Sequence, residues 1–134
     1  MPLPDRLYGV SMTWEQRAAE AGELATRLGQ PEVDARLLEL LLDVEDTAVS
    51  QAAADPLLAR RDVAGLGLYV EAFGLAEEDT RNKLGDCLYD EDGTTWAFVR
   101  RLLPTLLADA RPVVRQGAAA VDEHMAEEER HHGR

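Results

Sequence analysis

The fold is decided by the stretch Leu37–Ala54, LLELLLDVEDTAVSQAAA, which occurs again in altered form as Leu102–Ala119, LLPTLLADARPVVRQGAA. The two stretches begin 65 residues apart and carry the same amino acid at eight of their eighteen positions. All but one of the shared residues are leucine, valine or alanine, which indicates helix faces that pack on neighbouring helices. A spacing of this size fits two units of about 32 residues, a length typical of helical repeats. We therefore expect stacked helices.

Composition favours an all-α fold in a single domain. The chain has 134 residues, of which 46% are hydrophobic and only 5% are aromatic. The core must therefore come from leucine, alanine and valine at helical spacing, and few β-branched runs compete in favour of strands. Cys87 is the only cysteine, which excludes an internal disulfide and fits a reducing compartment. We expect its side chain to be a small member of the core.

Apolar residues recur at helical spacing in seven segments, and polar residues or prolines mark where these segments begin. Thr13 and Gln16 form a T-x-x-Q pair, which predicts a capping box at the first helix. Pro56 and Pro104 should bend the helices that contain them. The expected helices begin near Thr13, Pro31, Asp46, Asp62, Glu77, Thr94 or Thr95, and Pro112.

The same pattern predicts the domain organisation. Residues 1–12 are expected to be irregular, because Pro2 and Pro4 break any regular start. Residues 13–128 are expected to form a single helical-repeat domain, and residues 129–134 a flexible tail. Short connections between the segments favour antiparallel neighbours. The predicted architecture is all-α, with about seven helices stacked as antiparallel hairpins.

A leucine-rich helix, a short acidic turn and a V-x-x-A-A-x-x-L helix resemble the HEAT and armadillo class of α-solenoids, particularly short bacterial HEAT-like repeats. The first copy has Leu37, Leu38, Leu41, Leu42, Asp46, Val49, Ala52, Ala53 and Leu57. The second copy has Leu102, Leu103, Leu106, Leu107, Asp109, Val114, Ala118 and Val121. Pro104 is similar to the kink of first helices in that class, whereas Gly117 replaces an expected alanine. The resemblance implies a concave protein-binding surface or scaffold, without catalytic residues.

Charge argues against nucleic-acid and membrane partners. Twenty-six acidic residues against fourteen lysines and arginines give a formal net charge of −12, which repels phosphate backbones and anionic lipids. Arg100, Arg101, Arg111 and Arg115 lie near one another in the sequence, but no aromatic residues alternate with them as in a nucleic-acid site. The N-terminus has no leader pattern, and no apolar run approaches the length of a membrane span. We expect a cytoplasmic protein.

Two patterns suggest a metal site, and neither is convincing. Leu88–Gly93 is similar to half of an EF-hand loop, but the first and twelfth ligand positions would be Leu88 and Val99, which are apolar. His124, Glu128 and His131 would share one helical face if the tail were helical. We predict no metal, no cofactor and no catalytic residues, because no nucleophile has a base beside it and no phosphate-binding glycine loop occurs.

The sequence therefore favours a non-enzymatic protein-binding module with a basic protein partner. An acidic cytosolic protein of this size would suit an immunity protein that neutralises a toxin, since complementary charge speeds association. The candidate partner-binding residues are the polar positions outside the apolar stripes: Asp55, Asp86, Asp90, Glu91, Asp92, Asp122 and Glu123.

Two alternatives remain open. One is a small-molecule or metal-handling domain with a pocket near Cys87, Tyr89 and Trp96, although such aromatic residues more often belong to a core. The other is a self-assembling scaffold, because the ends of a solenoid expose apolar faces unless they are capped.

Overall fold

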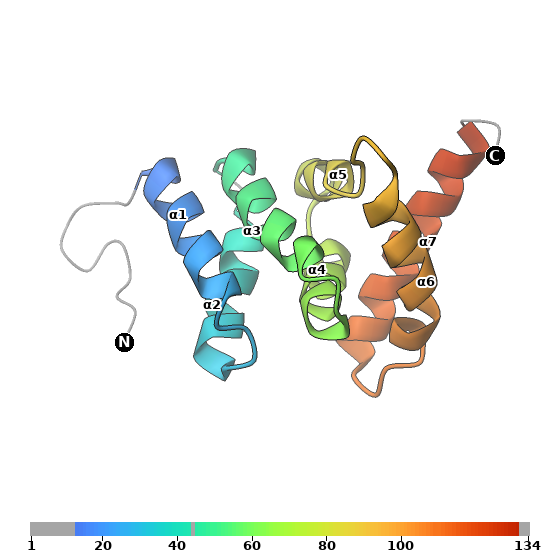
Figure 1. Ribbon diagram of the computed structural model, residues 1–134, viewed down its shortest axis with the longest axis horizontal. Coiled ribbons are helices and arrows are strands. Elements are labelled where there is room, and N and C mark those ends of the chain that lie inside the picture. Colours follow the sequence, from blue (N-terminus) through green and yellow to red (C-terminus); the bar gives the residue numbers. More distant parts are fainter. Residues whose placement is uncertain (1–12, 44, 132–134) are drawn as a thin grey trace.

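The computed structural model describes residues 13–43 and 45–131. These residues form seven α-helices and no β-strand (Figure 1). In chain order the helices are α1 (Trp14–Ala25), α2 (Pro31–Leu41), α3 (Thr47–Ala59), α4 (Val63–Leu75), α5 (Glu78–Asp86), α6 (Thr94–Leu107) and α7 (Pro112–His131). The prediction of an all-α fold with about seven helices is confirmed. The irregular segment expected at residues 1–12 lies outside the described residues.

Local sequence signals start most of the helices. The Thr13 hydroxyl oxygen accepts the Gln16 amide at 3.1 Å, and the Gln16 side chain accepts the Thr13 amide at 2.8 Å, so the predicted capping box is present. The carboxylates of Asp46 and Asp62 each accept an amide of the following helix at 2.9 Å. Asp46 therefore caps α3 and Asp62 caps α4, as predicted.

The start of α6 differs from the prediction, which placed the cap at Thr94 or Thr95. The cap residue is Gly93, in the left-handed region at φ 72°, where a residue without Cβ is unstrained. The free amides of the first turn are instead satisfied from further upstream. The Asp90 carboxylate accepts the Thr95 amide at 3.2 Å, and Asp92 accepts the Thr94 amide at 3.2 Å.

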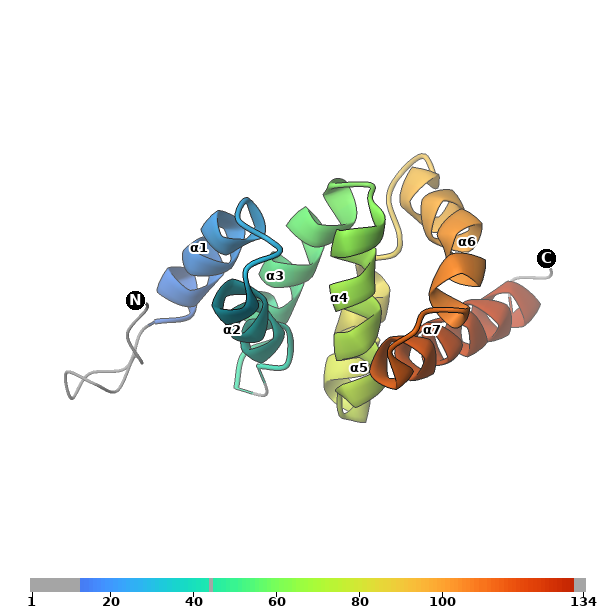
Figure 2. The same ribbon diagram turned by 90° about the horizontal axis from the view of Figure 1, so that it is seen from below.

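Helix α4 lies in the middle of the molecule (Figures 1 and 2). Helices α1, α2 and α3 lie at one end of the molecule, α6 and α7 lie at the other, and α4 and α5 lie between them (Figures 1 and 2). Helix α4 makes its most extensive contact with α7, and α1 packs mainly on α3. Seven of the thirteen residues of α4 are buried, as expected for a helix that is apolar on most sides.

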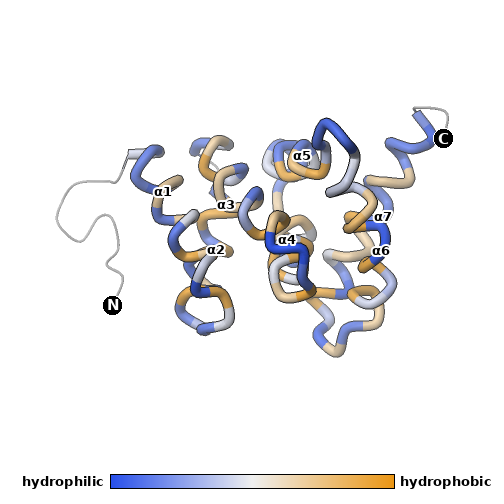
Figure 3. The backbone as a smooth tube through the Cα atoms, in the orientation of Figure 1, coloured by the Kyte–Doolittle hydropathy of each residue, from blue (hydrophilic) through white to orange (hydrophobic). Residues whose placement is uncertain are grey.

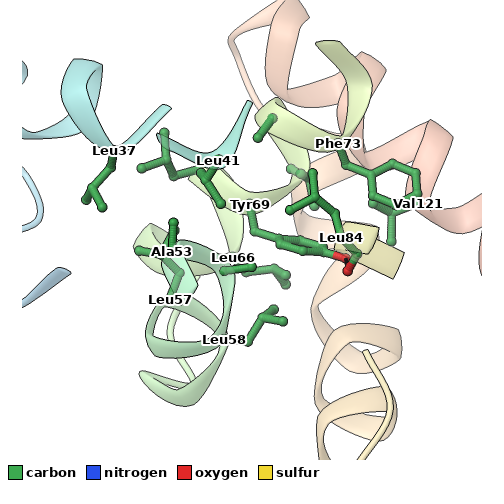
Figure 4. Close-up of a cluster of buried hydrophobic side chains, with 14 of the residues drawn as sticks. Leu37, Leu41, Ala53, Leu57, Leu58, Leu66, Tyr69, Phe73, Leu84 and Val121 are labelled. Carbon is green, nitrogen blue, oxygen red and sulfur yellow. Dashed lines mark hydrogen bonds between the residues drawn. The ribbon is translucent and has the colours of Figure 1, made fainter. Parts of the chain in front are cut away.

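Side chains from all seven helices form one core, and Figure 4 shows the part of it where residues of α2, α3, α4, α5 and α7 meet. Tyr69 and Phe73 of α4 are the largest fully buried members. The Tyr69 hydroxyl donates to the Leu84 carbonyl oxygen of α5 at 2.6 Å, so the single polar atom of this side chain is satisfied inside the core. Burial raises the pKa of Tyr69 well above its ordinary value, and the hydroxyl stays neutral.

Two glycines bring the backbones of α4 and α7 into contact. A Cβ on Gly117 would overlap the Val70 carbonyl oxygen, and a Cβ on Gly74 would lie 2.8 Å from the Gly117 Cα. The alanine expected at position 117 from the HEAT-like pattern therefore has no room here. Glycine therefore permits the backbones to approach closely where α4 meets α7, the most extensive helix contact among the described residues.

The two related stretches of sequence share a layout and differ in packing. Each spans the end of one helix, a loop and the start of the next, α2 to α3 and α6 to α7. Leu41 and Leu106 occupy equivalent positions and are both buried, whereas Ala54 is buried and its counterpart Ala119 is exposed. Their origin as copies of one solenoid repeat stays a prediction.

Helix α7 is longer than expected, since it runs to His131. Residues 129–131 are therefore helical, and the other residues of the predicted tail, 132–134, lie outside the described residues. The physical reason is Glu129, whose carboxylate accepts the Arg100 guanidinium at 2.9 and 3.0 Å and the Trp96 indole N–H at 3.1 Å. These bonds tie the last turns of α7 to α6.

Candidate binding site

The structure gathers most of the predicted acidic residues at the end of the molecule formed by the α5–α6 loop and the C-terminal half of α7. We call the segments 86–92 and 122–129 the acidic end. They contain nine aspartates and glutamates and no lysine or arginine. Figure 3 shows hydrophilic residues along the α5–α6 loop and the last turns of α7. Of the seven predicted residues, Asp86, Asp90, Glu91, Asp92, Asp122 and Glu123 belong to the acidic end. Asp55 lies on α3, and its carboxylate is next to the Cys87 thiol at the edge of that end.

The predicted residues do not have equal roles. The Asp90 and Asp92 carboxylates accept hydrogen bonds from backbone amides in the first turn of α6, as described above. The Asp122 carboxylate forms an ion pair with Arg100 at 2.6 Å. Asp86, Glu91 and Glu123 are exposed, and their carboxylates make no hydrogen bond or ion pair with the described part of the chain. These three carboxylates are therefore well placed to meet a partner.

A pocket of about 420 Å³ opens at the acidic end. Its most prominent feature is an aromatic pair, in which the rings of Tyr89 and Trp96 lie 5.2 Å apart at an interplanar angle of 34°. Tyr89 is 49% exposed, which is unusual for a large aromatic side chain in a chain with few of them. The pocket is lined by Leu88, Tyr89, Asp90, Glu91, Gly93, Trp96, Glu128 and Glu129.

Helix α7 fixes both rings. The Tyr89 hydroxyl donates to Glu128 Oε1 at 2.6 Å, and the Trp96 Nε1–H donates to Glu129 Oε2 at 3.1 Å. Glu129 is itself held by Arg100. Because each polar ring atom has a partner on α7, the two rings are positioned before any ligand arrives.

The electrostatics of the pocket favour a cation. Hydrogen bonds from Thr95 and Thr94 lower the pKa of Asp90, and the Arg100 hydrogen bond lowers the pKa of Glu129. Burial and the hydrogen bond to Glu128 raise the pKa of Tyr89 to about 12. At neutral pH these two carboxylates are therefore ionised while the phenol is neutral.

Sequence reasoning found part of this pocket and missed part of it. Tyr89 and Trp96 were named together with Cys87, but Cys87 does not line the pocket. Its thiol lies 3.6 Å from the Lys83 carbonyl oxygen, and burial raises its pKa, so it is mostly a protonated thiol at neutral pH. Glu128 and Glu129 were missed, because nothing local pairs them with rings more than thirty residues away.

The three residues considered as metal ligands point to different neighbours. His124 packs on Phe73 with ring centroids 5.5 Å apart, and its Nε2 is buried against Gly85 without a hydrogen-bond partner. Glu128 accepts a hydrogen bond from the Tyr89 hydroxyl, and His131 Nε2 lies 3.8 Å from Glu127 Oε1. Among the described residues, no three histidine, cysteine or acidic side chains converge to hold a metal ion.

A second depression of about 480 Å³ lies between α2, α4 and the α6–α7 loop. Its apolar lining includes Leu38, Val63 and Leu68. Its carboxylates are already engaged within the protein, for example Glu71, which pairs with Arg111 at 3.1 Å. This groove therefore offers less unsatisfied charge than the pocket at the acidic end.

Over the stretch that the structure describes, no helix is long and apolar enough to cross a lipid bilayer. Comparison with protein families, curated protein sequences and solved structures found no match to this chain.

Proposed function

We propose that this protein is a non-enzymatic binding module that recognises a basic protein through its acidic end. The observation that carries the proposal is the convergence of two acidic segments, 86–92 and 122–129, around an aromatic pair of which Tyr89 is exposed and Trp96 partly buried. Opposite charge steers a basic partner to this end of the molecule and accelerates association. Tyrosine and tryptophan supply a large rigid contact area, which is why they are enriched at the energetic centres of interfaces.

A HEAT-like scaffold role and a cytoplasmic location are parts of the same proposal. The resemblance of the two related stretches to α-solenoid repeats supports a scaffold that presents surface area and not reactive groups. Within that class, we favour an immunity-type protein that neutralises a basic toxin, on the grounds of its small size and its net charge of −12. Such a role predicts that its production protects cells from the partner toxin.

The test compares two variants with the same change in net charge. Glu91→Lys with Glu123→Lys alters the acidic end, and Glu23→Lys with Glu45→Lys alters exposed positions on α1 and the α2–α3 loop. Wild type and the control pair should retain a basic protein from extracts of the producing cell, whereas the acidic-end pair should lose it. The purified partner should then bind wild type less tightly as salt is raised. Equal retention by all three proteins, or no retained protein, would contradict the proposal.

A small-molecule-binding function is the second candidate, because one observation favours it. The pocket volume of about 420 Å³ falls within the range of about 300–1,000 Å³ that is usual for ligand sites. A melting-temperature screen separates the candidates, since a ligand that binds the folded state raises the midpoint. A midpoint raised by a neutral metabolite would favour this second function over protein recognition.

A further inference from the structure

We infer that the pocket lined by Tyr89 and Trp96 accepts the guanidinium group of an arginine side chain. The inference rests on the proposed function and specifies which group of the basic partner enters the acidic end. It combines two features of the pocket: ring surfaces held in place, with Tyr89 exposed, and an excess of carboxylates.

The rings are held in a binding-ready arrangement. Hydrogen bonds to Glu128 and Glu129 occupy the hydroxyl of Tyr89 and the indole N–H of Trp96. What the aromatic side chains offer a ligand is therefore their π surface and not their polar atoms. A cation over the face of a tryptophan or tyrosine ring is attracted by the negative potential of that face.

The negative charge of the pocket favours binding of a cation. Four carboxylates line it, and two of the protein's own guanidinium groups lie at its edge: Arg61 lies 3.6 Å from Asp90, and Arg100 lies 2.9 Å from Glu129. The exposed carboxylate of Glu91 has no hydrogen bond or ion pair with the described residues. An entering cation would meet this charge, and an anion would be repelled.

Arginine fits better than lysine. A guanidinium is planar and weakly hydrated, so it stacks on a ring while its edge N–H groups reach carboxylates at the rim, whereas an ammonium holds its water more strongly. The protein already uses this pairing internally. Arg81 lies 5.3 Å from the centroid of Phe73, and Arg61 and Arg101 lie 5.3 and 5.8 Å from that of Phe98.

The experiment uses Trp96 as its own reporter. The chain has two tryptophans, so the full-length Trp14→Phe variant leaves Trp96 as the only indole. The fluorescence of this protein is titrated with three capped pentapeptides, Gly-Gly-X-Gly-Gly, in which X is arginine, lysine or citrulline, the neutral analogue of arginine. We expect a saturable change with arginine, a weaker one with lysine and none with citrulline. Equal responses to arginine and citrulline, equal affinity for lysine, or no saturable response would overturn the inference.

Variants in the same background locate the contact. Tyr89→Ala should weaken binding of the arginine peptide by about three- to tenfold through loss of a ring. Glu91→Gln should weaken it by about two- to fivefold, and the matched control Glu23→Gln, on exposed α1, should leave it unchanged. Circular dichroism shows whether each variant is folded. If Glu91→Gln and Glu23→Gln have equal effects on binding, the cation does not sit in this pocket.

The outcome also separates this inference from the proposed function. If a partner protein binds through the acidic end but the arginine peptide does not bind, the inference fails and the function stands. If the arginine peptide binds as expected but no protein is retained by the acidic end, the protein-binding function fails and the guanidinium site stands.

Discussion

At the scale of single residues, Gly117 determines how α7 meets the centre of the fold. Its missing side chain lets α7 contact the backbone of α4 at Val70 and Gly74. A glycine inside a helix costs about 0.5–1 kcal/mol relative to alanine. At position 117 glycine is needed despite this cost, because a larger residue would prevent the close approach of α4 and α7. At Gly22 of α1 no contact requires glycine, since a Cβ would meet nothing within 4 Å.

Substitution by alanine should therefore change the free energy of unfolding in opposite directions at Gly117 and Gly22. Gly117→Ala should lower the free energy of unfolding by about 1–3 kcal/mol, because the new methyl group meets backbone atoms of α4 that are held within a helix. Gly22→Ala should raise it by about 0.4–1 kcal/mol. Urea denaturation followed by circular dichroism measures both. A Gly117→Ala protein as stable as wild type would show that α4 and α7 are not packed as closely as described.

At the scale of elements, helix α6 has one side buried against its neighbours and one side exposed to water. Two adjacent leucines lie on these different sides. Leu106 is 1% exposed, whereas Leu107 is 39% exposed. In α2, Leu41 occupies the position equivalent to Leu106 and is fully buried. The apolar pattern of the sequence therefore identified the helix, while only the packing shows which leucine of each pair carries the stability.

Replacing these leucines by alanine tests that assignment. Leu41→Ala and Leu106→Ala should each cost about 2–5 kcal/mol, because each leaves a cavity among side chains that cannot fully collapse. Leu107→Ala should cost much less, since its side chain is partly in water. Chemical denaturation of the three variants provides the comparison. Small and equal losses at Leu41 and Leu106 would discredit the assignment of both to the core.

The junction of the α5–α6 loop, α6 and α7 should depend on pH. Folding lowers the pKa of Asp90 and of Glu129, so each carboxylate stabilises the folded state above its ordinary pKa of about 4. That contribution is lost as the pH falls through the lowered value. The melting temperature of wild type should therefore fall between about pH 5 and pH 3.

The variant Asp90→Asn should show a shallower fall over that range, since it has already lost the titrating group. Glu91→Gln serves as the control and should follow the wild-type slope, because Glu91 has no partner in the described chain. Parallel curves for wild type and Asp90→Asn would mean that the bonds from Thr94 and Thr95 do not depend on the charge.

At the scale of the whole molecule, α7 covers one side of the central helix α4. Val121 of α7 and Phe73 of α4 are both fully buried in the shared core (Figure 4). In a solenoid with weakly coupled repeats, the terminal unit can be lost while its neighbours remain folded. Here α7 packs on a helix near the middle of the chain more extensively than on its sequence neighbour α6. The contacts therefore favour a single cooperative unit.

Truncation after Ala110 removes α7 and tests this cooperativity. The shortened chain should lose its sigmoidal thermal transition, because the faces of α4 around Val70 and Phe73 would be exposed to water. Circular dichroism melts of the full and shortened chains give the comparison. A shortened chain that melts cooperatively, with the helix content of the remaining helices, would instead support independent stacking of repeats.

The sequence by itself determined the class of fold and the helix starts that depend on local chemistry. Leucine and alanine at helical spacing define helices because the period of apolar residues is a local property of the chain. The capping box at Thr13 and the caps at Asp46 and Asp62 likewise act within a few residues. Only the tertiary structure decided that Gly117 is a close-contact residue, that Glu129 extends α7, and that Tyr89, Trp96 and two glutamates share a pocket. These depend on residues more than twenty positions apart, and no local pattern encodes which distant side chains will meet.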